Sequence, residues 1–296
     1  MAGLLPGRRR VWRAPAKVNL TLHILGRRAD GWHDLDSVVA FAGCGDWLIF
    51  EPAATLSLEV DGPTAEAAGA IGDNLILRAA RNLQERAPGL RLGRFHLRKT
   101  LPVAAGLGGG SSDAAAALRA LADANDLAAD DPRLWAAAQA TGSDVPVCLD
   151  PRARTMGGLG ERLGPPLRLP PLFAVLVNPR VAVATPAVFA RLGLAKGTSS
   201  GLAAPPALDI GSGRAEAMAA FERGRNDMQA AACALAPTIS RVLEALSILR
   251  GVSLTRMSGS GATCFAIFET RAAASRAGAS LRREHPDWWV KATVLR

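Results

Sequence analysis

A glycine-rich stretch at residues 101–117 has the sequence LPVAAGLGGGSSDAAAA, and the rest of the chain is organised around it. Glycine has no Cβ, so consecutive glycines let backbone N–H groups converge on a ligand. The alanine run that follows predicts a helix, whose N-terminus offers unpaired N–H donors and the positive end of the helix dipole. A glycine-rich loop that opens a helix therefore predicts a phosphate-binding site.

The loop matches neither of two common nucleotide-binding patterns. A Walker A loop ends in Gly-Lys-Ser/Thr, and no lysine lies between Gly106 and the helix. The dinucleotide pattern GxGxxG fails because Ser111 takes the place of its third glycine. For the loop alone, a flexible surface turn is the alternative interpretation. The predicted strand at 94–101 and the predicted helix that continues to about Asp123 favour the phosphate site.

Two further stretches contain residues suited to chemistry. Lys17 lies in an otherwise apolar predicted strand at 11–25, where a lone lysine is more typical of a side chain that reaches solvent from an edge. Asp144 lies in the segment TGSDVPV at 141–147, where Ser143 or Asp144 alone indicates a turn or a helix cap. The segment RADGWH at 28–33 contains an aromatic–histidine pair, which alone indicates packing.

Taken together, these segments resemble one enzyme superfamily. The pattern PxxxGLGGGSSxAA at 102–115 resembles the phosphate loop of the galactokinase, homoserine kinase, mevalonate kinase and phosphomevalonate kinase (GHMP) superfamily. PAKVNL at 15–20 is similar to its first motif, and MSGSGA at 257–262 to its third, with a plain hairpin turn as the alternative for the latter. RADGWH resembles a segment found in one family of the superfamily, the kinases of 4-diphosphocytidyl-2-C-methyl-D-erythritol. The resemblance covers residues 11–296.

The resemblance implies an α+β fold with two domains. The N-terminal ATP-binding domain, expected at 11–165, is similar to a domain of a ribosomal protein, and the C-terminal domain, expected at 166–296, is ferredoxin-like. We expect residues 1–10 to be a disordered basic tail. The glycine- and proline-rich segment 154–171 is expected to be a hinge between the domains.

The reaction implied by the resemblance is ATP-dependent phosphorylation of the 2-hydroxyl of 4-diphosphocytidyl-2-C-methyl-D-erythritol, in the non-mevalonate route to isoprenoids. Asp144 is then the catalytic base, and Lys17 pairs with it and stabilises charge on the transferred phosphoryl group. Mg²⁺ is expected with ATP, without assigned protein ligands. The residues expected to bind ATP are Pro102, Val103, Ala104, Ala105, Gly106, Leu107, Gly108, Gly109, Gly110, Ser111 and Ser112.

The residues implied for the substrate lie in three other segments: Asn19, Trp32, His33, Thr185 and Phe189. In the family the aromatic–histidine pair holds the cytosine, and Trp32 here replaces a tyrosine. An indole stacks on a base by roughly 1–3 kcal/mol. We expect Phe189 opposite Trp32 across the base, with core packing as the alternative for Phe189. Ala104 and Ala105 replace glycines of the family, so the backbone at both is expected to avoid positive φ.

The remaining pattern predicts an ordinary mixed fold. Asn226 and Asp227 are expected mainly to cap a helix, and Pro237 interrupts the helical run 226–249. Residues 194–213 are expected to be a mobile loop, and 251–269 a strand–turn–strand unit. Further strands are predicted at 37–42, 47–50, 55–60, 172–178 and 288–295, and further helices at 75–85, 132–140, from Thr185, and at 271–283.

Composition limits the classes of protein that the chain can be. Hydrophobic residues make up 49% and charged residues 21% of the chain, as in globular proteins. No run of 18 apolar residues predicts a membrane span, and residues 1–13 lack the hydrophobic stretch of a secretory signal. We therefore expect a cytoplasmic protein. The 4 cysteines are scattered, which predicts buried free thiols and no zinc site.

Two other hypotheses stay open at the level of sequence. One is another small-molecule kinase of the superfamily, acting on homoserine or a mevalonate-type alcohol; the RADGWH segment argues against it. The other is a non-enzymatic RNA-binding protein, because the net charge is +9; Lys17 and Asp144 at motif spacing argue against that. We expect a small-molecule substrate, no nucleic-acid or membrane partner, and a monomer or weak homodimer.

Overall fold

The computed structural model describes residues 10–206, 208, 210 and 213–296. These residues form two compact units that are discontinuous in sequence. The first unit combines 10–14 with Gly45–Val103 and Gly109–Leu149, and the second combines Pro15–Cys44, Ala104–Gly108 and Asp150–Arg296. The predicted disordered tail lies outside the described residues, except for Arg10, which begins a strand.

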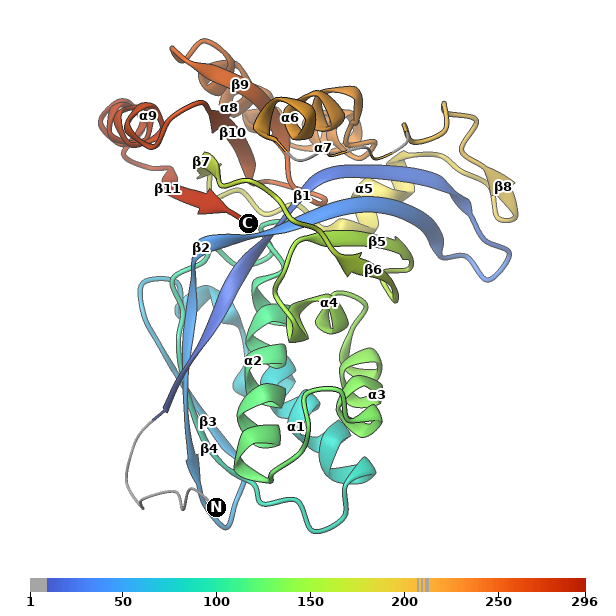
Figure 1. Ribbon diagram of the computed structural model, residues 1–296, viewed down its shortest axis with the longest axis vertical. Coiled ribbons are helices and arrows are strands. Elements are labelled where there is room, and N and C mark those ends of the chain that lie inside the picture. The colour runs from blue at the N-terminus through green and yellow to red at the C-terminus, as the bar shows by residue number, and fades with distance from the viewer. Residues whose placement is uncertain (1–9, 207, 209, 211–212) are drawn as a thin grey trace. The chain divides into compact units, whose positions relative to one another are not determined.

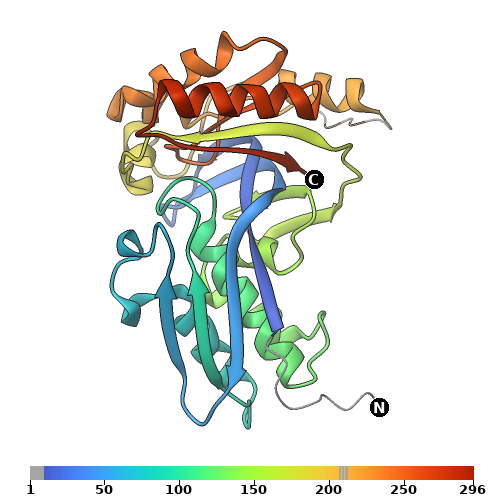
Figure 2. The ribbon, with the colours of Figure 1, turned by 90° about the vertical axis from the view of Figure 1, so that its left-hand side faces the viewer.

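Alternating apolar residues build the sheet of the first unit. Strand β4 (Gly93–Arg98) buries Phe95 and Leu97 and turns its arginines outward. It pairs antiparallel with the C-terminal part of β2 (His33–Pro52) and parallel with β3 (Ser57–Asp61). Figure 2 shows these three strands side by side.

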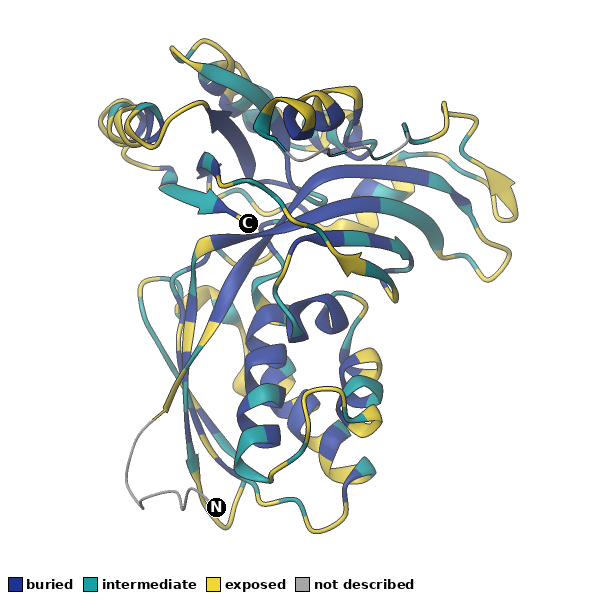
Figure 3. Ribbon diagram, viewed as in Figure 1, coloured by how far each residue is buried: buried dark blue, intermediate teal, exposed yellow. Residues whose placement is uncertain are grey.

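Four helices complete the first unit. They are α1 (Leu75–Arg86), α2 (Gly109–Ala124), α3 (Pro132–Thr141) and α4 (Val145–Leu149), and they pack against one another. Helix α1 begins where predicted, because the Asn74 side chain accepts a hydrogen bond from the Ile76 N–H at 3.0 Å. Six of the alanines of α2, between Ala114 and Ala122, are buried and small, which allows close packing (Figure 3). The sequence analysis missed α4 and two 3₁₀ turns, Glu66–Ala68 and Ile71–Asp73.

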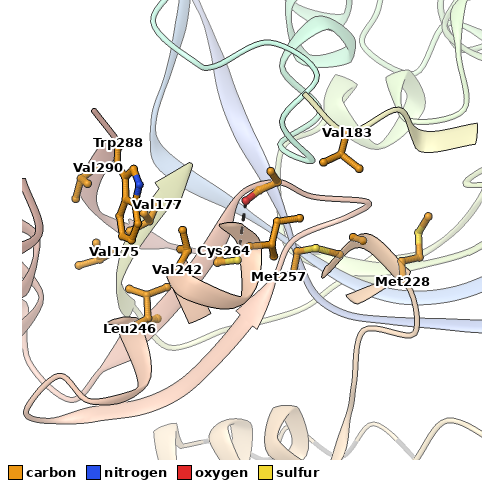
Figure 4. Packing of buried hydrophobic residues seen from close by; sticks show 14 of the residues in the cluster. Val175, Val177, Val183, Met228, Val242, Leu246, Met257, Cys264, Trp288 and Val290 are labelled. Carbon is orange, nitrogen blue, oxygen red and sulfur yellow. Dashed lines mark hydrogen bonds between the residues drawn. The ribbon is translucent and has the colours of Figure 1, made fainter. Parts of the chain in front are cut away.

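The second unit is built on an antiparallel sheet with helices packed on it. The strand order is β11 (Trp289–Leu295), β7 (Leu172–Asn178), β10 (Cys264–Phe268) and β9 (Val252–Met257). Helices α8 (Thr238–Ser247) and α9 (Arg271–Glu284) pack against these strands (Figure 1). The apolar core between them includes Val175, Val177, Val242, Leu246 and Trp288 (Figure 4).

The other elements of the second unit surround this sheet. Strand β1 (Arg10–Arg27) begins in the first unit and pairs at its far end with β8 (Thr198–Ser199). Helices α5 (Thr185–Arg191), α6 (Arg214–Arg223) and α7 (Gln229–Leu235) complete it. The mixed α+β fold expected from the sequence is confirmed.

The expected hinge at 154–171 is wrong as a description of that segment. It contains β5 (Arg154–Gly158) and β6 (Arg162–Pro166), and β5 pairs with Leu35–Val39 of β2. Pairing with a neighbouring strand outweighs the low strand propensity of glycine.

The two strands predicted at 37–42 and 47–50 are parts of one continuous strand, β2. Gly43 does not break it: a Cβ there would lie 3.3 Å from the Thr293 Oγ1, so glycine allows close approach. Neither α6 nor β8 was predicted from the sequence. Residues 207, 209, 211 and 212 of the expected mobile loop lie outside the described residues.

A buried arginine holds three backbone carbonyls of the second unit. The Arg256 guanidinium donates to the carbonyl oxygens of Leu20 at 2.6 Å, Phe221 at 2.9 Å and Gly224 at 2.6 Å. The last two lie at the end of α6, where carbonyls have no partner within the helix. Burial lowers the pKa of Arg256 to about 10. Arg256 therefore fixes the end of α6 against β1.

The burial of the cysteines agrees only in part with the prediction from the sequence. All 4 cysteines are free thiols, but Cys44 and Cys233 are half-buried, whereas Cys148 and Cys264 are buried. Burial raises the pKa of the Cys264 thiol.

Among the described residues, no helix has both the length and the apolar content needed to span a membrane.

Candidate active site

The glycine-rich segment 104–108 is held in the second unit by backbone hydrogen bonds on both sides. The Lys17 N–H donates to the Leu107 carbonyl at 2.8 Å, and the Thr263 N–H donates to the Ala105 carbonyl at 3.1 Å. The Ser258 hydroxyl donates to the Gly106 carbonyl at 2.8 Å. The turn at 257–262 thus folds back against the loop and is more than a plain hairpin turn.

Gly106 lies close against the turn at 257–262. A Cβ at Gly106 would lie 2.2 Å from the Ser258 carbonyl oxygen, and φ is +71°. Both features require glycine, because a side chain would clash with the backbone and strain the left-handed conformation. The close packing explains why small residues crowd both segments.

The expectation that Ala104 avoids positive φ is wrong. Its φ is +49°, in the left-handed region that costs a non-glycine residue about 1 kcal/mol or more. Ala105, in contrast, does not have positive φ and is buried. The hydrogen bonds on Ala105 and Gly106 fix the turn that Ala104 enters, and the alanine methyl group is small and exposed. The tertiary contacts therefore override the local preference.

Lys17 is buried beside this segment, with a relative exposure of 4%. A Cβ on Gly108 would lie 3.2 Å from the Cβ and Cε atoms of Lys17. The lysine therefore does not reach solvent from a strand edge, which rules out that interpretation. A buried ammonium beside a loop of N–H donors adds positive charge where an anion is expected to bind.

Asn19 follows Lys17 on the same side of β1 and contacts the turn. Its N–H donates to the Ser258 hydroxyl at 3.1 Å, and its Nδ2 donates to the Ser37 hydroxyl at 2.8 Å. Its Oδ1 is buried and has no hydrogen-bond partner among the described residues. A buried acceptor without a donor is costly unless a ligand or water supplies one.

Thr185 begins α5 and lies against the same turn. Its hydroxyl is 2.7 Å from the hydroxyl of Ser260. Phe189 lies one helical turn further along α5 and stacks on the imidazole of His33, with ring centroids 4.4 Å apart and planes inclined by 20°. The second unit therefore brings Asn19, the turn, Thr185, Phe189 and His33 into one chain of neighbours.

Trp32 and His33 occupy different environments. Trp32 is 64% exposed, and the ring in contact with Phe189 is His33, not Trp32. Burial, and then the charge of Arg27, lower the pKa of His33, which favours the neutral imidazole. The His33 Nε2 is buried and has no hydrogen-bond partner among the described residues. A neutral imidazole can donate or accept there.

The other expected residues lie in the first unit. Gly109, Gly110, Ser111 and Ser112 form the first turn of α2, whose N–H groups have no partner within the helix. Ser112 is buried, and Gly110 is exposed. Asp144 is half-buried and precedes α4 directly. Lys17 and Asp144 thus belong to different units of the chain.

Sequence reasoning missed several residues that shape the site. Asn226 was expected mainly as a cap, and its Oδ1 does accept from the Met228 N–H at 2.9 Å. Its Nδ2 also donates to the carbonyls of Met257 at 2.7 Å and Gly259 at 2.9 Å, so it braces the turn. Ser258 and Ser260 stood in the quoted motif but had no assigned partners. No local pattern identifies Ser37.

Comparison with known proteins extends this description. The model of the GHMP kinases N terminal domain matches residues 74–151, and that of the GHMP kinases C terminal domain matches 212–287. The 4-diphosphocytidyl-2-C-methyl-D-erythritol kinase of Xanthobacter autotrophicus is 61% identical over 287 residues, which cover 96% of this chain and 98% of that one. The kinase of the same name from Methylobacterium radiotolerans is 56% identical over 285 residues, covering 96% and 98%.

The chain belongs to the GHMP kinases, in the family of 4-diphosphocytidyl-2-C-methyl-D-erythritol kinases. A crystal structure of 4-(cytidine 5'-diphospho)-2C-methyl-D-erythritol kinase has a TM-score of 0.74 and 34% identity, covering 97% of this chain and 99% of that chain. As a member of this kinase family, the chain is an enzyme, so the non-enzymatic alternative is wrong. GHMP kinases use ATP as their phosphoryl donor.

The close approach at Gly106 gives a test of the loop's packing. Gly106→Ala should lower the free energy of unfolding by about 2–3 kcal/mol, because a Cβ meets the Ser258 carbonyl and strains the backbone. Gly110→Ala is the matched control: its Cβ would meet only the Leu75 Cδ1, at 3.4 Å. That variant should be as stable as wild type, or more stable by up to about 1 kcal/mol. Urea denaturation measures both. Wild-type stability of Gly106→Ala would contradict the packing described.

Proposed function

We propose that this chain transfers the γ-phosphoryl group of ATP to the 2-hydroxyl of 4-diphosphocytidyl-2-C-methyl-D-erythritol, in the non-mevalonate pathway to isoprenoids. The observation that carries the proposal is the stack of His33 on Phe189 in the same unit as Thr185 and Asn19. Aromatic faces beside polar groups suit a base linked to a polyol. Relatives that match nearly the whole chain carry the name of this activity.

The glycine-rich residues 102–112 hold the phosphates of ATP. The N-terminus of α2, with the positive end of its helix dipole, supplies positive potential for them. Mg²⁺ accompanies the triphosphate and neutralises charge that develops during transfer. The described residues contain no group of three His, Cys, Asp or Glu side chains arranged to hold a metal ion. Mg²⁺ prefers oxygen ligands and is commonly held by the phosphates of the nucleotide and by water, so a cation that arrives bound to ATP needs no such group.

Asp144 accepts the proton of the substrate's 2-hydroxyl while the hydroxyl oxygen forms a bond to the γ-phosphorus of ATP. The bond from that phosphorus to the bridging oxygen breaks, and ADP leaves. Lys17 stabilises the charge on the transferred group. The transition state is loose, so positioning and electrostatics supply most of the catalysis.

The base and the polyol of the substrate are bound by different residues of the second unit. Trp32, which is exposed, stacks on the cytosine, and the unpartnered Nε2 of His33 faces its polar edge. Phe189 lies opposite Trp32 across the base, and Thr185 begins the helix that carries Phe189. The unpartnered Oδ1 of Asn19 accepts a hydrogen bond from the polyol.

The proposal extends to the organisation of the protein. The kinase domain comprises residues 11–165 and the C-terminal domain residues 166–296. The enzyme is cytoplasmic, where ATP is abundant, and acts as a monomer or weak homodimer without a nucleic-acid partner. Its basic residues are dispersed along the sequence, which argues against a dedicated nucleic-acid-binding surface.

Removing the proposed base should abolish turnover and spare nucleotide binding. Asp144→Asn should lower kcat by about a hundredfold or more, because an amide cannot accept the proton, while the KM for ATP changes little. Ser143→Ala, in the same turn and exposed, is the control and should stay active. Activity of Asp144→Asn within about tenfold of wild type would show that Asp144 is not the base.

Removing the indole should affect one substrate selectively. Trp32→Ala should raise the KM for the cytidylated substrate by about tenfold to a hundredfold, from the loss of roughly 1–3 kcal/mol of stacking. Trp32→Tyr should change it by less than about threefold, because a stacking surface remains. The KM for ATP serves as the internal control. An unchanged KM for the cytidylated substrate in Trp32→Ala would remove Trp32 from the site.

A further inference from the structure

Three charged side chains form a buried cluster in the first unit. The Lys99 Nζ lies 2.5 Å from the Asp46 Oδ2 and 2.8 Å from the Asp113 Oδ2. The side chains of Lys99, Asp46 and Asp113 are 5%, 0% and 4% exposed. Burying charges is costly, and apolar residues of similar volume would fill this space at least as well. The cluster therefore calls for a reason beyond packing.

The cluster lies against the chain on both sides of the glycine-rich loop, before it and after it. The Asp46 Oδ1 accepts from the Leu101 N–H at 2.9 Å, which fixes the chain as it enters the loop. Asp113 lies one turn into α2, the helix that begins at Gly109. A Cβ on Gly109 would lie 3.6 Å from the Lys99 Nζ and 3.8 Å from the Asp46 Oδ2. The three side chains thus lie directly against the first turn of α2.

The charge of the cluster is not balanced. Burial alone lowers the pKa of Lys99, but the carboxylates of Asp113 and Asp46 outweigh it and raise that pKa. Burial raises the pKa of Asp113 to about 7; the charge of Lys99 opposes this shift and that of Asp46 adds to it. The Asp113 Oδ1 has no hydrogen-bond partner among the described residues. One cation thus faces two carboxyl groups, one of which is incompletely bonded.

We propose that Lys99, Asp46 and Asp113 form a positioning cluster that sets the first turn of α2 for the phosphates of ATP. This inference rests on the function proposed above. Lys99 joins the helix to the chain entering the loop, so the N–H groups of the first turn keep a fixed direction. None of the three residues needs to touch the nucleotide.

The cluster also couples the protonation of Asp113 to nucleotide binding. With Asp113 protonated, one cation faces one anion; with Asp113 ionised, the cluster carries a net negative charge beside the turn that receives phosphates. The charged groups that face Asp113 are Lys99 and Asp46. Phosphate binding is therefore favoured when Asp113 holds a proton, and it weakens as the pH rises through about 7.

The experiment compares the binding of a non-hydrolysable ATP analogue with Mg²⁺ to the full-length wild type and to Asp113→Asn at pH 6, 7 and 8, by calorimetry. Asparagine keeps the size of the side chain and an acceptor for Lys99 but cannot ionise. The analogue's own titration cancels in the ratio of the two Kd values. Asp126→Asn is the matched control, because Asp126 lies in the same unit and its side chain is 85% exposed.

The Kd of wild type relative to Asp113→Asn should rise about fivefold from pH 6 to pH 8, as expected if the pKa of Asp113 is about 7 in the free protein and about one unit higher in the complex. The Kd of wild type relative to Asp126→Asn should stay constant. A wild-type to Asp113→Asn ratio that stays constant within about twofold would overturn the proposal. Equal changes in the KM for ATP and the KM for the alcohol substrate in Asp113→Asn would also overturn the proposal, because they would indicate a merely structural role.

A second variant keeps the proposal testable by another route. Lys99→Met leaves two carboxyl groups without their cation and should weaken analogue binding by about tenfold or more. Adding Asp113→Asn to that variant should restore part of the affinity, whereas no restoration would count against the cluster. If Lys99→Met does not fold, the Asp113→Asn series decides alone. Because the analogue needs no alcohol substrate, wild type that binds it but phosphorylates nothing would count against the proposed function, not the cluster.

Discussion

The packing of segment 104–108 against the turn at 257–262 is the constraint on which the second unit's site depends. The carbonyls of Ala105, Gly106 and Leu107 are held by Thr263, Ser258 and Lys17, which come from distant parts of the sequence. The same Ser258 hydroxyl accepts from the Asn19 N–H. One set of backbone contacts therefore places the loop, the lysine and the asparagine together, and it requires glycine where the two backbones meet.

The aromatic residues and the residues proposed to bind phosphate are positioned by different kinds of interaction. The aromatic part needs only neighbouring side chains: His33 on Phe189, with Thr185 one turn away. The phosphate part needs oriented backbone N–H groups, which are fixed by buried charge and by hydrogen bonds. A kinase that works chiefly by positioning gains from rigidity at both parts. The buried Lys99 contacts carboxyl groups in the first unit, and the buried Arg256 contacts backbone carbonyls in the second.

The sequence was informative where chemistry imposes a local pattern. The glycine-rich loop, its helix, Asn74 as a cap and the turn at 257–262 follow from residues close together in the chain. Sequence patterns failed where distant contacts override local preference, as for the positive φ of Ala104 and the strands within 154–166. The same limit explains why Asp46, Ser37 and Asn226 were not singled out for their contacts. Their partners are brought together only by the fold.

The central claim is that a phosphate loop and a base-binding segment act on one cytidylated alcohol. The most direct measurement is ADP release from ATP and Mg²⁺ with four alcohols: 4-diphosphocytidyl-2-C-methyl-D-erythritol, 2-C-methyl-D-erythritol 4-phosphate, homoserine and mevalonate. We expect turnover with the first compound alone. Turnover with an uncytidylated alcohol would contradict the role of the segment at 28–33, and no turnover with any of the four would contradict the assigned reaction.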